Sequence, residues 1–228
     1  MLTRLPTRLD RLHERWRDPV LTALTVLIAV TMFGVEPLRA AGVIESPGPG
    51  PVLVFLIAIG LLVVSRSLLP ILAIAIAVAL LVTSLVLHHL GGYAILDVVL
   101  NATAWLIIGT AIVWVTARAV FGPGRVTYHR VIGAILLYLA VGLVFVALYA
   151  FVGVLAPGAF SGFQSLEPGR LLSELIYFSF VTLTTVGYGD IAPLHPVARS
   201  LCNLEAIFGQ LYPATLLARL VTLQIQSQ

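Results

Sequence analysis

The stretch "YFSFVTLTTVGYGDIAP", residues 177–193, decides the fold of this chain. Within it, "TVGYG" at 185–189 is too polar and too rich in glycine to face lipid, yet apolar sequence lies on both sides. Non-helical backbone at membrane depth is tolerated only where it is buried in protein or lines a water-filled path. Gly187 and Gly189 permit φ > 0, so that successive carbonyls can turn to one side. The stretch therefore predicts a short re-entrant helix followed by a loop that lines such a path.

The composition agrees with a membrane location. The chain has 228 residues, of which 60% are hydrophobic and only 10% are charged. A soluble domain of this length could not cover so much apolar surface with so few charges. The composition therefore indicates an integral membrane protein. The one cysteine, Cys202, excludes an internal disulfide and is expected to be a small buried side chain.

Six apolar stretches approach or reach the ~20 residues that a spanning helix needs. They cover residues 20–35, 52–65, 68–87, 94–120, 131–155 and 197–223. A seventh stretch, 171–184, is too short to span and leads directly into TVGYG. The sequence thus predicts an all-α membrane fold with six transmembrane helices and a re-entrant pore helix. Its parts are a surface helix at 1–18, a four-helix domain at 19–120 and a pore domain at 125–228.

The first 18 residues predict an amphipathic helix on the membrane surface, with a stripe of arginines beside an apolar stripe. The arginines expected to bind anionic lipids are Arg4, Arg8, Arg11 and Arg15. Arg66 and the basic cluster at 118–130 fall on the same side of the membrane as the N-terminus. The positive-inside rule then predicts that both termini are cytoplasmic and that the protein lies in the plasma (cell inner) membrane. A signal peptide with its core at 20–35 is the alternative, and its length and cleavage residues fit poorly.

From about residue 130 to 221 the chain resembles the pore domain of potassium channels, with an outer helix, a pore helix, a filter and an inner helix. The run "TLTTVGYGD" at 182–190 matches the family filter residue for residue. The resemblance implies a homotetramer, because one loop cannot enclose a pore. It implies that K⁺ binds along the filter loop, with the Thr185 hydroxyl as the innermost ligand. The ion-binding residues are Thr185, Val186, Gly187, Tyr188 and Gly189.

The resemblance also implies which residues support this filter. Asp190 braces it from behind, and Thr184 supports it at its inner end. Tyr177 and Phe178 fall where the family carries a cuff of aromatic side chains. Val181 is a departure, because some relatives carry an acidic residue there that pairs with the aspartate behind the filter.

Two features of the inner helix leave alternatives open. Gly209 aligns with the family's glycine hinge, and Pro213 follows one turn later and favours a kink. Close packing of Gly209 against a neighbouring helix is the other interpretation. Glu205 lies well inside the membrane, where an unpaired carboxylate is costly. It either faces the cavity or accepts hydrogen bonds from pore-helix hydroxyls such as Thr182 or Thr184.

The front helices lack the signature of a voltage sensor. The stretch 94–120 carries Asp97 near one end and Arg118 near the other, with no arginine ladder between them. Asp97 and Asn101 lie one turn apart, and either form a small polar site or satisfy one another. The remaining candidates are histidines that would confer acid sensitivity if they titrate near the pore mouth. They are His88, His89 and His195.

Taken together, these features predict selective and passive permeation of K⁺, without strong voltage gating. The sequence has no nucleophile constellation, metal cluster or phosphate-binding loop, so it predicts no enzyme, no cofactor beyond the permeant ion and no nucleic-acid partner. One alternative is a non-conducting assembly or sensory protein that retains a channel fold. The other is a subunit of a potassium transporter.

Overall fold

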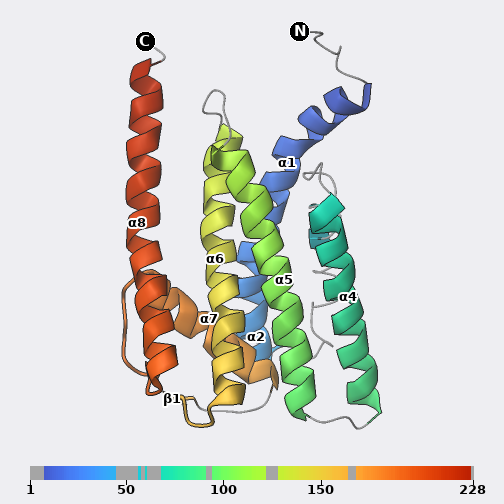
Figure 1. Cartoon of the computed structure of the whole chain (residues 1–228), viewed down its shortest axis with the longest axis vertical. Coiled ribbons are helices and arrows are strands. Elements are labelled where there is room, and N and C mark those ends of the chain that lie inside the picture. Colours follow the sequence, from blue (N-terminus) through green and yellow to red (C-terminus); the bar gives the residue numbers. More distant parts are fainter. Residues whose placement is uncertain are drawn as a thin grey trace.

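A computed structural model describes residues 8–44, 56–57, 60, 68–90, 94–121, 128–163 and 168–226. These residues form an almost entirely helical structure, which confirms the all-α class (Figure 1). The helices are α1 (Arg8–Val30), η1 (Thr31–Val35), α2 (Glu36–Ala40), α4 (Leu68–His89), α5 (Ala94–Phe121), α6 (Tyr128–Leu155), α7 (Pro168–Leu183) and α8 (Pro196–Gln226). Two short strands, β1 (Phe160–Ser161) and β2 (Ala192–Pro193), flank α7.

Four helices among the described residues are long and apolar enough to cross a membrane, which supports a multi-pass membrane protein. They cover Pro19–Ala40, Leu68–His89, Ile95–Phe121 and Val131–Leu155. The expected stretch at 52–65 lies mostly outside the described residues. The expected stretch at 197–223 lies within α8, which has 31 residues and is therefore about 46 Å long. Six crossings remain a prediction.

The first membrane helix differs from the predicted one at both ends. We expected a surface helix that ends at residue 18 and a separate helix at 20–35. Instead, α1 continues through Pro19, because a helix can pass a proline at the cost of one hydrogen bond and a bend. The helical path then continues through the π-helical turn η1 and through α2 to Ala40. Glu36 and Arg39 lie beyond the predicted stretch but within α2, where Arg39 donates to both carboxylate oxygens of Glu36 at 3.0 and 3.1 Å.

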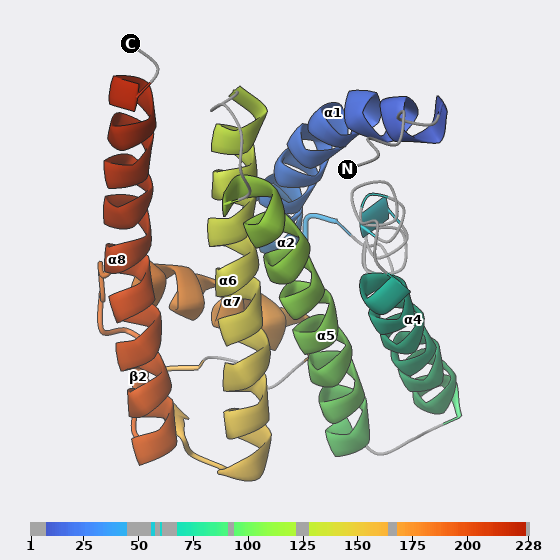
Figure 2. The same cartoon turned by 45° about the horizontal axis from the view of Figure 1, so that its top comes forward.

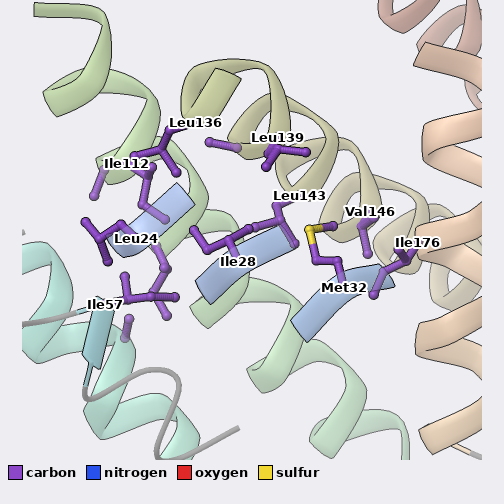
Figure 3. Close-up of a cluster of buried hydrophobic side chains, with 14 of the residues drawn as sticks. Leu24, Ile28, Met32, Ile57, Ile112, Leu136, Leu139, Leu143, Val146 and Ile176 are labelled. Carbon is purple, nitrogen blue, oxygen red and sulfur yellow. The ribbon is translucent and has the colours of Figure 1, made fainter. Parts of the chain in front are cut away.

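Helix α6 is the centre of the bundle and contacts α1, α5, α7 and α8. Figure 3 shows the buried side chains of Leu24, Ile28 and Met32 against those of α6. The α6 side chains in this layer are Leu136, Leu139, Leu143 and Val146, with Ile112 of α5 and Ile176 of α7 beside them. Lipid is as apolar as these side chains, so tight van der Waals packing rather than water exclusion holds such helices together.

Helix α7 is the short helix that leads into the TVGYG loop. It has 16 residues, and in both views it extends from beside α8 to behind α6 and contacts both helices (Figures 1 and 2). At about 24 Å it is too short to cross the ~30 Å core of a bilayer. The expected pore helix at 171–183 falls within it. The N-terminal end of α1 and the C-terminal end of α8 lie at the same end of the molecule (Figure 1).

Candidate ion-conduction site

The loop that follows α7 has an unusual backbone. Thr185, Gly187 and Gly189 have φ angles of 59°, 56° and 79°, so every second residue of the loop lies in the left-handed region. Thr185 is the sole non-glycine residue with positive φ in the part of the chain that the structure describes. In an ordinary strand, successive carbonyls point in opposite directions. Alternation of positive and negative φ instead turns them toward one side.

Hydrogen bonds fix the start of this loop to the last turn of α7. The Thr184 amide donates to the Phe180 carbonyl at 3.0 Å, and the amides of Val186 and Gly187 donate to the Val181 carbonyl at 3.0 and 3.3 Å. These bonds satisfy carbonyls that a helix end otherwise leaves without a donor. The expected support residue Thr184 also donates its hydroxyl back to the Phe180 carbonyl at 2.6 Å. The loop therefore leaves α7 in a defined direction.

Tyr177 joins α7 to the residue that follows the loop. Its hydroxyl donates to Asp190 Oδ2 at 2.7 Å, and its ring lies parallel to that of Tyr188, with 6.5 Å between the centroids. This hydrogen bond holds the pKa of the Asp190 carboxyl below its usual range. The acidic residue with which some potassium channels pair this aspartate is replaced here by Val181. Tyr177 is the hydrogen-bond partner of Asp190 instead.

Phe178 lies differently from its neighbour in the predicted aromatic cuff. It is buried, and its ring contacts those of Tyr149 and Phe160 at centroid distances of 4.9 and 5.5 Å. The ring contact with Tyr188 comes from Tyr177 instead. The physical reason is helical geometry, because consecutive residues of α7 point about 100° apart and cannot face the same neighbour.

The segment before α7 anchors the C-terminal end of the loop. Strand β1 pairs antiparallel with β2, with Phe160 opposite Pro193. The Ala159 carbonyl accepts from the amides of Leu194 and His195 at 2.8 and 3.1 Å. Gly162 has a φ of 91°, and a Cβ there would overlap the Asp190 carbonyl oxygen. This close approach requires glycine and places the backbone of the earlier segment directly behind Asp190.

Glu205 is fully buried and joins three helices. Its two carboxylate oxygens accept hydrogen bonds from Ser179 of α7 and from Tyr149 of α6, each at 2.5 Å. The structure therefore has the hydrogen-bonded arrangement, with Ser179 in place of the expected Thr182 or Thr184. The sequence analysis missed Tyr149. A tyrosine in the middle of the apolar stretch 131–155 was the available signal, because a buried phenol needs a partner.

Gly209 lies against the end of α7. A Cβ at this position would overlap the Leu183 carbonyl oxygen, and the Tyr138 hydroxyl donates to that same oxygen at 3.2 Å. Helix α8 runs unbroken through Gly209 and Pro213. Close packing therefore applies to Gly209, while the hinge role of Gly209 and Pro213 stays a prediction.

The next residue, Gln210, was also missed by the sequence analysis. Its Nε2 donates to the Thr185 hydroxyl oxygen at 2.8 Å, so α8 contacts the first residue of the TVGYG loop.

The polar residues of the front helices form a cluster between α4 and α5. Asn101 donates to the Ser84 hydroxyl at 2.6 Å and to the Asp97 backbone carbonyl at 2.8 Å. His88 Nδ1 lies 3.1 Å from Asp97 Oδ2. Near the other end of α5, Arg118 lies over the Trp114 ring at 4.4 Å from its centroid. Asp97 and Asn101 thus belong to one network that Ser84 and His88 complete.

Comparison with known proteins points to the class of protein that this geometry fits. Residues 133–225 match the protein-family model described as "Ion channel". Over 94 residues the chain is 33% identical to "Two pore potassium channel c" of Oryza sativa subsp. japonica, an alignment that covers 41% of this chain and 19% of that protein. Over 51 residues it is 41% identical to "Protein LctB" of Bacillus caldotenax, covering 22% of this chain and 37% of that protein. No solved structure matches.

The chain thus spans less than two fifths of the length of either relative. The match to the family model falls on α6, α7, α8 and the loop between the last two. They support an ion-channel function and indicate a channel rather than an enzyme.

Proposed function

We propose that this chain is one subunit of a tetrameric, potassium-selective channel that lets K⁺ pass passively through the loop at 185–189. The observation that supports this most directly is the backbone of that loop. Positive φ at Thr185, Gly187 and Gly189, with negative φ between them, is the pattern that aligns carbonyls on one side. It occurs on the sequence TVGYG, immediately after a helix too short to span the membrane.

Four such loops around one axis provide the chemistry of selection. Loops of this sequence form the known filters of potassium channels, where carbonyl oxygens replace the hydration shell of the ion. Here the oxygens are the carbonyls of Thr185, Val186, Gly187 and Tyr188, together with the Thr185 hydroxyl. The C-terminal end of α7 carries the negative end of its dipole and favours a cation nearby.

The exposure of the loop in a single chain supports assembly. The side chains of Val186 and Tyr188 are 53% and 72% exposed, although both carry large apolar surfaces. Neighbouring subunits around a central axis would cover them. Potassium-channel filters use four such loops, and a chain that contributes one loop supplies four as a tetramer.

Weak voltage dependence follows from α5. One charge that crosses the whole membrane field gains about 2.3 kcal/mol per 100 mV, so steep gating needs several charges in each subunit. Arg118 is the one arginine of α5, and it lies near the end of the helix.

The same proposal includes cytoplasmic termini, a location in the cell inner membrane and lipid binding by the N-terminal arginines. Arg4 and the side chains of Arg8, Arg11 and Arg15 lie outside the described residues.

The test is uptake of ⁸⁶Rb⁺ into proteoliposomes that hold a potassium gradient, with barium as a blocker. We expect uptake that barium stops and that a sodium gradient does not drive. Tyr188→Asp should abolish the preference for potassium over sodium, because it places a charge beside the carbonyls. Thr222→Val, which removes a hydroxyl bonded only within α8, is the matched control and should conduct like the wild type.

Two outcomes would overturn this proposal. A wild-type protein without flux under any stimulus would favour a non-conducting assembly or sensory protein. Retained selectivity in Tyr188→Asp would remove the filter assignment.

A further inference from the structure

The inner end of the TVGYG loop is packed from two sides. The Tyr138 hydroxyl of α6 donates to the Leu183 carbonyl at 3.2 Å, and Gly209 of α8 lies directly against the same carbonyl. Because Gly209 has no side chain, the α8 backbone comes within reach of the loop at this level. The residue that follows Gly209 is therefore placed beside Thr185.

That residue is Gln210, and its side chain makes one specific contact. The Gln210 amide nitrogen donates to the Thr185 hydroxyl oxygen at 2.8 Å. A hydroxyl oxygen has two lone pairs. The amide uses one of them, and this fixes the direction of the other. The Thr185 hydroxyl therefore cannot rotate freely about its Cα–Cβ bond without losing this bond.

The surroundings of Gln210 make a polar side chain there unexpected. Three large side chains near it on α8 are apolar and more than half exposed, namely Leu204, Ile207 and Leu211. An amide among such side chains is costly in a membrane unless it is paired or faces water. Its described partner is the innermost residue of the loop, so the amide serves the loop rather than the packing of α8.

We propose that Gln210 is a positioning residue for the innermost cation site of the filter. By donating to the Thr185 hydroxyl, it orients the free lone pair of that oxygen toward an ion on the pore axis. This inference rests on the proposed channel function, and it assigns α8 an indirect part in ion binding, through the Thr185 hydroxyl. Its consequence is specific. Loss of the Gln210 amide weakens ion binding at the inner end of the filter, while the carbonyl sites nearer Tyr188 remain.

Barium alone is the probe, because its radius is close to that of K⁺ and its double charge strengthens each oxygen contact. The concentration for half-inhibition of ⁸⁶Rb⁺ uptake is measured with barium on both sides of the membrane. Gln210→Met keeps the length of the side chain but removes the amide. We expect this concentration to rise about five- to tenfold, the effect of losing one hydrogen bond.

A double-mutant cycle separates positioning from general structural damage. Thr185→Val removes the hydroxyl at constant shape. It should raise the barium concentration needed for half-inhibition by a similar factor. The double variant should then match Thr185→Val, since Gln210 acts through that hydroxyl. Gln210→Asn keeps an amide, but its side chain is one methylene too short to reach Thr185. It is the second variant if Gln210→Met assembles poorly, and it should show the same rise in the half-inhibitory barium concentration. Thr215→Val is the control, because its hydroxyl bonds only carbonyls of α8.

The outcomes separate this inference from the proposed function. If the wild type conducts and Gln210→Met leaves barium block unchanged, the inference fails and the channel function stands. Effects that multiply in the double variant also overturn it, because Gln210 then acts independently of Thr185. A wild type that passes no ⁸⁶Rb⁺ overturns the proposed function and this inference with it.

Discussion

The two hydroxyls that bind Glu205 are not equivalent. Ser179 also lies 3.0 Å from the Gly142 carbonyl, which remains as an acceptor if the carboxylate is removed. The other neighbour of the Tyr149 hydroxyl is Cys202 Sγ at 3.5 Å, a weak acceptor. Removal of the carboxylate therefore leaves mainly one buried donor, that of Tyr149, without a good partner. Such a donor costs roughly 1–3 kcal/mol.

Glu205→Leu should therefore lower the stability of the folded protein by roughly 1–3 kcal/mol. Glu205→Gln should lower it less, because the amide oxygen still accepts from one hydroxyl. The measurement is the unfolding temperature of the protein in detergent. Thr222→Val is the control and should change little, because its hydroxyl bonds only Ala218 of the same helix. Equal effects of Gln and Leu would show that hydrogen bonding is not what Glu205 contributes.

The bond between Tyr177 and Asp190 predicts a pH effect whose sign is fixed. Because the Tyr177 hydroxyl lowers the pKa of Asp190, the ionised carboxylate stabilises the folded loop above the ordinary carboxyl pKa. This stabilisation is lost as the pH falls through the lowered value. In Tyr177→Phe the pKa of Asp190 should rise toward its ordinary value, and this pH-dependent part of the loop's stability should disappear.

Carbon-13 NMR of aspartate-labelled protein, assigned with Asp190→Asn, measures this titration. Tyr212→Phe is the control, because the Tyr212 hydroxyl bonds the Ala134 carbonyl instead. An unchanged Asp190 titration in Tyr177→Phe would contradict the assignment of Tyr177 as its partner.

At the residue scale the sequence predicted which groups need partners but not every partner. Glu205 had to be paired, and a pore-helix hydroxyl was expected. Ser179 and Thr182 lie three residues apart on neighbouring positions of one helix face, so the choice between them depends on a small rotation of α7. Tyr149 is 56 residues away along the chain, and only the packing of α6 on α8 brings it to Glu205.

At the element scale, the approach of α8 to α7 depends on one missing side chain. The Leu183 carbonyl occupies the space that a Cβ of residue 209 would need. Backbone cannot move aside as a flexible side chain does, so α8 or the end of α7 would have to shift. This shift would also separate Gln210 from Thr185. The packing of two helices and the geometry of the loop are thus coupled at this position.

Gly209→Ala should therefore lower the unfolding temperature and weaken barium block together. Gly153→Ala is the matched control, because no atom lies within 4 Å of a Cβ built at Gly153 in α6. There, alanine should stabilise the helix by up to about 1 kcal/mol through its higher helix propensity. A purely hinge-like Gly209 predicts altered opening at unchanged stability, so equal unfolding temperatures for Gly209→Ala and the wild type would exclude the packing role.

Element boundaries were predicted well where the apolar stretch ends at a turn and poorly where the helix continues into charged residues. The predicted stretch 131–155 ends with α6, at Leu155. The predicted stretch 20–35 ended before Glu36 and Arg39. Their ion pair at 3.0 Å neutralises both side chains and lets the helix run on to Ala40. Sequence alone does not reveal this pairing, because it appears only once the helix has formed.

At the scale of the whole molecule, α6 connects the front helices with the pore segment. Phe33 of η1 meets Phe180 of α7 edge to face, with 4.9 Å between the ring centroids. Arg219 of α8 donates to the Phe121 carbonyl at the end of α5, at 2.9 Å. The front helices therefore contact both α7 and the C-terminal part of α8. The TVGYG motif predicted the pore, but neither of these contacts has a local sequence signal.

The final prediction concerns which apolar face of the molecule lies between subunits. Ile207 of α8 and Leu72 of α4 are 54% and 59% exposed in one chain, so exposure alone does not distinguish them. Ile207 lies three residues before Gln210, on the same side of α8 as the loop contact, whereas α4 lies at the opposite edge of the bundle (Figure 1). Ile207→Trp should therefore reduce the tetramer fraction in native mass spectrometry, because a subunit interface has no room for the larger ring. Leu72→Trp should leave it unchanged, since fluid lipid accommodates the added bulk. Equal behaviour of the two variants, or a wild type that remains a monomer, would refute a central axis beside α8 and with it the enclosed pore.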